Sequence, residues 1–406
     1  MNYRKLLKIS NIIWILVLII LLYLSIHYSF ISADSPYYIS IARDISNGLV
    51  PYKDINSIYT PAMMYLNSII FRIFDDPRYH YFLVFQYVLI LLSSGLLYLI
   101  SRNLSLDKWK SAFLTLFLFI AVLSSDGTEI ILEVYILLCV LFAFWFLINK
   151  QFFWTGIFLA LSFFSKQYGI LNFLPYFLLV GVYHGFKKKY LINFILGATI
   201  PLLAFLVYFL LFEKVNSFDL IKQLSGSGYG QSNVSSSKSF FSLIAGFKVF
   251  LLLIFPLFFL RINPFKNKID GILIIGILVN LIPVLIQNFP HYFILTYPYI
   301  FILMARNYKN LDKRFLLVAN LMLVIISVLL FLRIFRYKDV YDEQLRVAEK
   351  YKNEFPVSSE VFLSGKIRYL YILNDYHNPV LKEVGYDYNF SPDEDFKKKY
   401  LVLELK

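Results

Sequence analysis

The chain has 406 residues, of which 59% are hydrophobic and only 16% are charged, and its mean hydropathy is +0.65. A soluble protein carries far more charge on its surface, so the composition predicts a polytopic membrane protein that is mainly α-helical. The single cysteine, Cys139, excludes a disulfide within the chain, and neither a Cys/His cluster with zinc spacing nor a glycine-rich phosphate loop occurs. Structural zinc and P-loop ATP chemistry are therefore not expected.

Eleven or so apolar stretches divide the chain. A bilayer core of about 30 Å needs about 20 helical residues, so the stretches that begin near 111, 152 and 291 are short for a crossing and could be re-entrant or tilted. The sequence thus predicts a membrane helix bundle of about eleven spans. The stretches are 11–31, 79–100, 111–125, 130–148, 152–165, 168–184, 190–212, 240–260, 271–287, 291–305 and 315–333.

The net charge of +13 is concentrated in short loops between the apolar stretches, which favours a role in membrane orientation over nucleic-acid binding. Placing the N-terminus in the cytoplasm puts the lysine- and arginine-rich loops on that side. The nearly neutral loop 32–78 and the tail from about 335 then lie outside the plasma membrane. The first stretch could instead be a signal peptide cleaved after Ala33, but its length favours a retained span. The basic loop residues are Arg4, Lys5, Lys8, Arg102, Lys108, Lys110, Lys150, Lys187 to Lys189, Arg261, Lys266, Lys268, Arg306, Lys309, Lys313 and Arg314.

The loop 32–78 is predicted to contain two interfacial helices. Ser35 followed by Pro36 is typical of a helix start, and Gly48 is typical of a helix end. Thr60 and Pro61 open the second helix, which carries Met64, Ile69, Ile70 and Phe74. The first helix would lie along the membrane surface through an apolar face formed by Tyr37, Tyr38, Ile41, Ala42 and Ile45.

Asp34 lies where the first span leaves the lipid and the first interfacial helix begins. A carboxylate held at this point can act as a general base on an acceptor hydroxyl, or it can bind a cation or an acceptor amine. The alternative is that Asp34 only helps to cap the helix that begins at Pro36.

More polar residues interrupt the apolar sequence at the same predicted level. Glu129 and Glu133 are four residues apart and are expected to share a helix face near Asp126, and Glu133 should face protein or a wet cavity. Lys166, followed by Gln167, suits a lipid phosphate as a point charge, although an isolated lysine often only extends to the interface. His291 and Tyr292 offer hydrogen bonds to the same phosphate, although a lone histidine there is often a polar cap.

The tail differs in composition from the rest of the chain. A helix over about 339–354 and strand patterns at 359–365, 368–373 and 400–405 predict a small α/β domain. We therefore expect a membrane domain over 1–334 and an extracytoplasmic domain over 335–406. A module of this size is marginally stable alone and should dock on the membrane domain.

In the order and spacing of its motifs, the sequence resembles the GT-C superfamily of membrane glycosyltransferases over most of its length. Specifically, it resembles the bacterial family 39-like branch, which includes protein O-mannosyltransferases and the lipid A aminoarabinose transferase. Members often have Asp-Glu where this chain has Asp34-Ser35, which leaves any role of the second acid open. The matching segments are Asp34 to Tyr38, Ala42, Gly48, Pro51 to Asp54, Pro61, Glu133, Gly156 to Gln167, His291 to Pro298, Ser359 to Gly365 and Leu370-Tyr371.

The resemblance implies an inverting transfer of a sugar from a polyprenyl phosphate to an extracytoplasmic glycan, lipid or protein. Asp34 would be the catalytic base, and Lys166, His291 and Tyr292 would bind the donor phosphate. No nucleotide or nucleic acid is implied, and the lipid tail would lie in a groove open to the bilayer. Some relatives use a divalent metal ion and others do not, so metal dependence is left open. Substrate-positioning residues would be Tyr52, Asp54, Glu133 and Gln167.

Two other functions share this hydropathy profile. A transporter or flippase of lipid-linked saccharides would show charged groups near the bilayer midplane, broken helices in pairs and two similar halves, and the sequence shows none of these. A non-catalytic subunit of an envelope assembly would tolerate replacement of its outer carboxylates.

Overall fold

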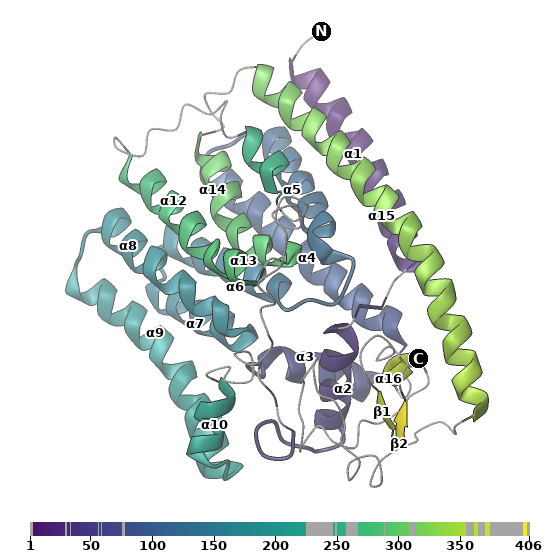
Figure 1. Ribbon diagram of the computed structural model, residues 1–406. Helices are drawn as coiled ribbons and strands as arrows, with labels where there is room; N and C mark the ends of the chain where they lie inside the picture. Colours follow the sequence, from purple (N-terminus) through teal and green to yellow (C-terminus); the bar gives the residue numbers. More distant parts are fainter. Residues whose placement is uncertain are drawn as a thin grey trace.

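The computed structural model is mainly α-helical (Figure 1). Among its described residues, six helices are long and apolar enough to cross a membrane, which confirms a polytopic membrane protein. The six are α1 (Tyr3–His27), α4 (Tyr79–Asn103), α5 (Lys108–Val122) with its continuation η1 (Leu123–Gly127), α9 (Lys188–Val207) with η3 (Tyr208–Phe212), α12 (Lys268–Asn280) with α13 (Ile282–Gln287), and α15 (Lys313–Glu354). The structure describes residues 3–28, 31–32, 34–55, 57, 59–74, 78–224, 247, 250–256, 267–287, 289–307, 313–354, 361–363, 370–373 and 401–403.

Shorter helices account for the other predicted stretches. They are α6 (Glu133–Ile148), α7 (Phe152–Ser165), η2 (Gln167–Asn172) with α8 (Phe173–His184), and η6 (Pro290–Thr296) with α14 (Tyr297–Asn307). The stretch 240–260 lies mostly outside the described residues. The number of membrane crossings stays a prediction.

Helix α1 runs alongside α15 and is joined to the bundle by polar contacts (Figure 1). The Asn320 Oδ1 atom accepts hydrogen bonds from Ser10 Oγ at 2.6 Å and from Trp14 Nε1 at 2.8 Å. Farther along α1, the Tyr87 hydroxyl donates to Ser25 Oγ at 2.8 Å. Such bonds are hard to replace in an apolar medium, which favours a retained first span over a cleaved signal peptide.

Helices α2 (Asp34–Ser46) and α3 (Ala62–Ile73) lie at the end of the bundle opposite the start of α1 (Figure 1). We call this the α2 end. The five predicted apolar residues of α2 are all buried, but so are most of its other residues, including Ser35, Ser40 and Arg43. The apolar face of α2 therefore packs against protein, and its position relative to the membrane surface stays a prediction. Helix α3 is amphipathic as expected, with Met64 buried and Ile69 exposed.

The tail departs from the prediction in two ways. The span at 315–333 and the helix at 339–354 are one continuous helix, α15, so the predicted boundary at 334/335 falls inside it. Strands β1 (Val361–Leu363) and β2 (Leu401–Leu403) form a parallel pair, but the strand pattern at 368–373 contains instead the short helix α16 (Leu370–Leu373). Helix α16 contacts α2, and Leu370 is fully buried. An apolar run of four residues fits either a strand or one helical turn, so the pattern alone could not distinguish the two structures.

Two glycines bring α7 and α9 unusually close. A Cβ atom at Gly156 would overlap the carbonyl oxygen of Phe194, and one at Gly197 would overlap the carbonyl oxygen of Phe153. Small residues that let helix backbones approach are a main source of helix association in membranes. The bend in the chain that carries Lys166 is attached to this pair.

We expect Gly156→Ala to lower the free energy of unfolding by about 1–3 kcal/mol, because neighbouring backbone must move to admit the methyl group. Gly95→Ala is the matched control, since a Cβ atom there meets no atom within 4 Å. Relief of glycine's conformational entropy should make that variant about 0.5–1 kcal/mol more stable. Denaturant unfolding in detergent would measure both, and equal effects of the two substitutions would refute the close-packing account.

A second prediction concerns Asp44, near the end of α2. Burial raises the pKa of its carboxyl to about 6 from 3.8, although the neighbouring Arg43 opposes the shift. Because the folded state holds this proton more tightly, stability should fall as the pH rises from about 4 to about 6. At neutral pH, Asp44→Asn should therefore stabilise the protein by up to about 3 kcal/mol. Thermal unfolding between pH 4 and 8 tests this, with the exposed Asp219→Asn as control; equal pH slopes for wild type and Asp44→Asn would contradict it.

Candidate active site

Lys166 is placed by a break in the helix between α7 and η2. Its backbone is extended, with φ −163° and ψ 146°, and the Gly169 N–H donates to its carbonyl at 2.8 Å. Gly169 lies so close to the carbonyl of Ser162 that a Cβ atom would overlap it. This tight bend directs the Lys166 side chain into the protein, where only 2% of it is exposed.

The Lys166 ammonium donates hydrogen bonds to a carboxylate and to a phenol hydroxyl. It donates to Glu133 Oε1 at 2.6 Å and to the Tyr292 hydroxyl at 3.2 Å. Glu133, 1% exposed, therefore faces protein as expected, and the alternative that Lys166 extends to the interface is wrong. The ammonium also lies 4.5 Å from the Tyr292 ring centroid, 5.5 Å from that of Tyr59 and 5.9 Å from that of Tyr168. We call Glu133, Lys166 and Tyr292 the lysine cluster.

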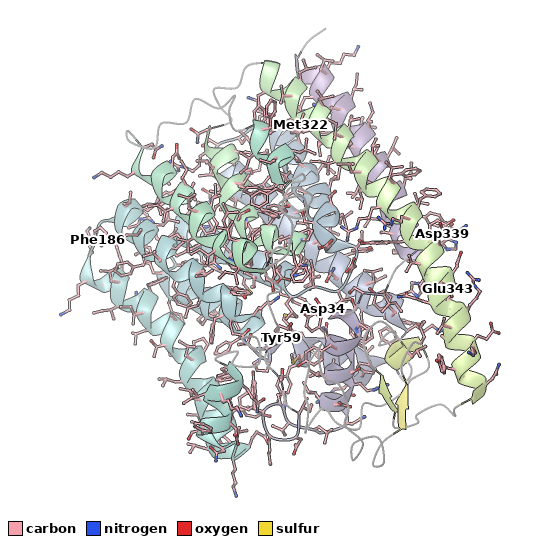
Figure 2. All side chains as sticks on the ribbon, in the orientation of Figure 1. Asp34, Tyr59, Phe186, Met322, Asp339 and Glu343 are labelled. Carbon is pink, nitrogen blue, oxygen red and sulfur yellow. The ribbon has the colours of Figure 1, made fainter. Side chains whose placement is uncertain are left out.

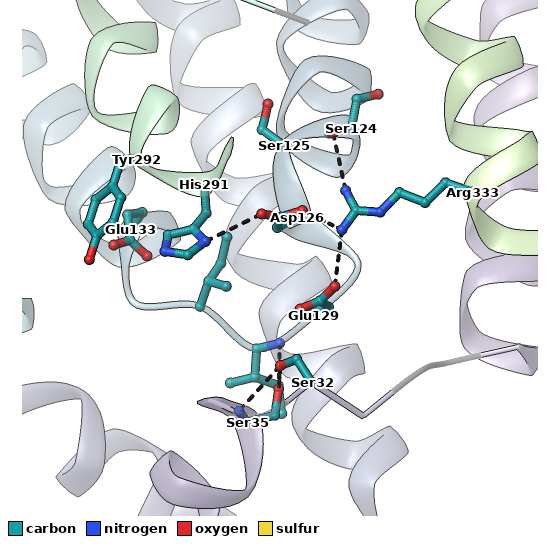
Figure 3. Close-up of polar contacts among 12 residues, drawn as sticks. Ser32, Ser35, Ser124, Ser125, Asp126, Glu129, Glu133, His291, Tyr292 and Arg333 are labelled. Carbon is teal, nitrogen blue, oxygen red and sulfur yellow. Dashed lines mark hydrogen bonds and ion pairs between the residues drawn. The ribbon is translucent and has the colours of Figure 1, made fainter. Parts of the chain in front are cut away.

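Beside the lysine cluster lies a second group of charges, the arginine cluster, formed by Asp126, Glu129, His291 and Arg333 (Figure 3). Arg333 of α15 forms ion pairs with Asp126 and, at 3.1 Å, with Glu129. The His291 Nδ1 atom lies 3.3 Å from Asp126 Oδ2. Because His291 and Tyr292 are consecutive in η6, this 3-10 helix contributes one side chain to each cluster.

The expectation that Glu129 and Glu133 share a helix face is wrong. Asp126 has a left-handed backbone, with φ 65°, and helix α6 begins only at Glu133. The chain between them is not helical, so Glu129 turns to Arg333 while Glu133 turns to Lys166. Repulsion between the two carboxylates is thereby reduced, since each has its own cation.

A buried glutamine from α4 holds the loop between the two clusters. Gln86 donates to the carbonyl oxygens of Gly127, at 3.0 Å, and Glu129, and accepts from the Ile131 N–H at 2.8 Å. The N–H of the preceding residue, Ile130, donates to Ser35 Oγ of α2 at 3.3 Å. The start of α2 is thus tied to the loop that presents Glu129 and Glu133.

Asp34 occupies the first turn of α2. The next residue, Ser35, accepts a hydrogen bond from the N–H of Ile130, in the loop that leads to Glu133 of the lysine cluster. The N–H of Ser35 is bound by Ser32 Oγ at 3.4 Å, so Ser32 provides a helix cap. Tyr59, which lies over Lys166, stacks edge-on against Tyr37 and Tyr38 of α2 at 5.7 and 5.4 Å. Figure 2 shows Asp34 and Tyr59 at the centre of the molecule, where the bundle meets α2 and α3.

The remaining predicted residues lie around the site. The Tyr52 hydroxyl donates to the carbonyl of Tyr59 at 2.8 Å, and Asp54 Oδ2 accepts from the Val50 N–H at 2.9 Å. Both therefore shape the loop that holds Tyr59 over Lys166. Gln167 is half-buried and begins η2 next to Lys166. Their role as substrate-positioning residues stays a prediction.

Within the described part of the chain, no group of three or more His, Cys, Asp and Glu side chains is arranged to hold a metal ion. Asp126, Glu129 and His291 come near one another, but Arg333 lies against both carboxylates. Metal dependence therefore stays open.

Sequence reasoning missed Arg333, Tyr337 and Tyr59. Arg333 ends the apolar stretch 315–333 at the same predicted level as Asp126, which was a usable signal because a cation there needs a partner. The Tyr337 hydroxyl accepts from Arg333 Nε at 2.6 Å and donates to Glu129 at 3.1 Å. A tyrosine one turn from an arginine is too common a pattern to have predicted this contact.

Solved structures that resemble most of this chain include two of one protein. They are crystal structures of ArnT from Cupriavidus metallidurans, one bound to undecaprenyl phosphate and one in the apo state. The TM-scores are 0.63 and 0.64, and each alignment covers 90% of this chain and 84% of ArnT at 13% sequence identity. The chain has the fold of ArnT. This is the fold implied by the sequence resemblance to the GT-C superfamily. No family model and no curated protein matches the sequence.

Proposed function

We propose that this protein is a membrane glycosyltransferase that moves a sugar from a polyprenyl phosphate to an acceptor at the α2 end of the bundle. The observation that carries the proposal is that α2, which begins at Asp34, packs through Tyr37 and Tyr38 against Tyr59, whose ring lies over the ammonium of Lys166. The fold adds support, since ArnT, which shares it, has been crystallised with undecaprenyl phosphate.

In the proposed reaction, Asp34 takes the proton of an acceptor hydroxyl as its oxygen attacks the anomeric carbon. The bond between that carbon and the phosphate oxygen breaks, and the polyprenyl phosphate leaves with the electron pair. Attack opposite the leaving group inverts the anomeric centre.

Lys166, Tyr292 and His291 would stabilise the charge that develops on the phosphate. Glu133 offsets part of the Lys166 charge and fixes its direction, so the ammonium is already in place before the donor binds. The hydroxyl of Tyr292 accepts from Lys166, which leaves its own hydrogen to donate to a phosphate oxygen. The lipid tail would lie among the apolar helices, and the α2 end would face outward from the plasma membrane.

The test uses the full-length protein in liposomes with a polyprenyl-phosphate sugar and an envelope extract as acceptor. Release of free polyprenyl phosphate together with a new glycosidic bond supports the proposal, and NMR of the product reports whether the anomeric centre is inverted. Movement of the lipid-linked sugar between leaflets without bond formation would favour a transporter. If the protein neither transfers nor translocates the sugar, and if variants with replaced outer carboxylates behave like wild type, a non-catalytic subunit is favoured.

A further inference from the structure

The short segment before Asp34 is held by a side chain from the far end of the sequence. The Ile31 N–H donates to Gln344 Oε1 at 3.2 Å, and Gln344 Nε2 donates to the Ile31 carbonyl at 2.9 Å. One amide side chain thus satisfies both backbone groups of Ile31, as a neighbouring β-strand would. Gln344 is 6% exposed and Ile31 is 2% exposed, so water does not compete for these bonds.

Gln344 belongs to the same helix as Arg333, the cation of the arginine cluster. The two are eleven residues apart, which is three helical turns plus about 20°, so they share a face of α15 and are separated by about 16 Å along its axis. Arg333 holds the loop with Asp126 and Glu129, and Gln344 holds the residue three positions before Asp34. A single rigid helix therefore contacts both acidic segments of the site.

We propose that Gln344 is a positioning residue for Asp34, and that α15 fixes the distance between the start of α2 and the arginine cluster. This inference rests on the proposed function for the role of Asp34. Ser32 and Ser35 transmit the constraint: their hydroxyls lie 2.9 Å apart, and Ser35 also binds the Ile130 N–H. Loss of the Gln344 contact would let the first turn of α2 move while leaving the lysine cluster intact.

The test combines hydrogen exchange with transfer kinetics on the full-length protein in nanodiscs. In Gln344→Ala, amides in peptides that contain Ile31 and Ser32 should exchange roughly tenfold or more faster, because the Ile31 N–H loses its acceptor. The kcat for sugar transfer should fall roughly 10- to 100-fold, because a displacement of about 1 Å at a reacting group has that effect. The KM for the donor should change less than about threefold, because the phosphate contacts remain.

Two further variants separate positioning from general damage. Gln344→Glu keeps an acceptor for the Ile31 N–H but loses the donor to its carbonyl, so its exchange and kcat should lie between wild type and Gln344→Ala. Glu343→Ala changes the neighbouring residue, which is 59% exposed and forms a salt bridge with Arg346 on the same helix; this variant should match wild type.

Unchanged exchange at Ile31 and Ser32 in Gln344→Ala would overturn the inference. So would faster exchange with an unchanged kcat, provided that Asp34→Asn is inactive in the same assay. If the wild-type protein transfers no sugar at all, the proposed function fails, and the exchange rates alone decide whether Gln344 fixes this segment.

Discussion

Asp34→Asn is expected to lower the rate of sugar transfer by roughly 100- to 10,000-fold, the usual contribution of a general base. Asparagine has nearly the shape of aspartate but cannot take the proton of the acceptor hydroxyl. Because Ser32 binds the Ser35 N–H, the start of α2 should stay in place. Release of polyprenyl phosphate at saturating donor and acceptor measures the change.

The matched control is Asp44→Asn, which removes a carboxylate from the same helix ten residues away. Asp44 is not part of either charge cluster, so this variant should transfer sugar at the wild-type rate. Thermal unfolding checks that both variants are folded. Full activity of a folded Asp34→Asn protein would show that the base is another residue.

Breaking the Glu133–Lys166 pair should have the largest effect on stability. Both side chains are almost fully buried, so Lys166→Met deprives the Glu133 carboxylate of the ammonium beside it, and Glu133→Gln deprives the ammonium of that carboxylate. Removing one partner of a buried pair typically lowers the free energy of unfolding by about 3–5 kcal/mol. The double variant, which contains no buried charge at these positions, should lose less than the sum of the two single effects. Denaturant unfolding of the four proteins in detergent completes the cycle.

The exposed pair Arg346–Glu343 on α15 serves as the control for this cycle. Its coupling should be only about 0–1 kcal/mol, because water screens it. Additive losses at Glu133 and Lys166 would mean that the two charges do not depend on each other. Neither of the two variants that lack Lys166 should transfer sugar, since Lys166 is also proposed to stabilise the leaving phosphate.

The helical membrane fold and most of the lysine cluster could be predicted from the sequence, and the reason is physical. A charge inside an apolar stretch is costly, so Glu133 and Lys166 had to meet partners, and alternation of the loops placed their ends at the same level. The same reasoning predicted that His291 and Tyr292 lie near these charges. It did not predict that Tyr292 joins the lysine cluster while His291 joins the arginine cluster.

Other features depended on tertiary packing that no local pattern contains. The burial of α2 arises because several elements surround it, including α3 and α16, and an amphipathic pattern reports only one apolar face. The separation of Glu129 from Glu133 follows from the left-handed backbone at Asp126, which helical spacing does not anticipate. Gln344 and Ile31 are 313 positions apart, and neither residue type signals such a contact.

We propose that a carboxylate and an ammonium from distant parts of the chain, Asp34 and Lys166, act on the same lipid-linked sugar phosphate. A cryo-electron microscopy structure of the protein with polyprenyl phosphate in nanodiscs tests it most directly. We predict phosphate density at hydrogen-bond distance, about 3 Å, from Lys166 and Tyr292, with Asp34 on the wall facing it. Phosphate density at the opposite end of the bundle, or separated from Asp34 by protein, would contradict the account.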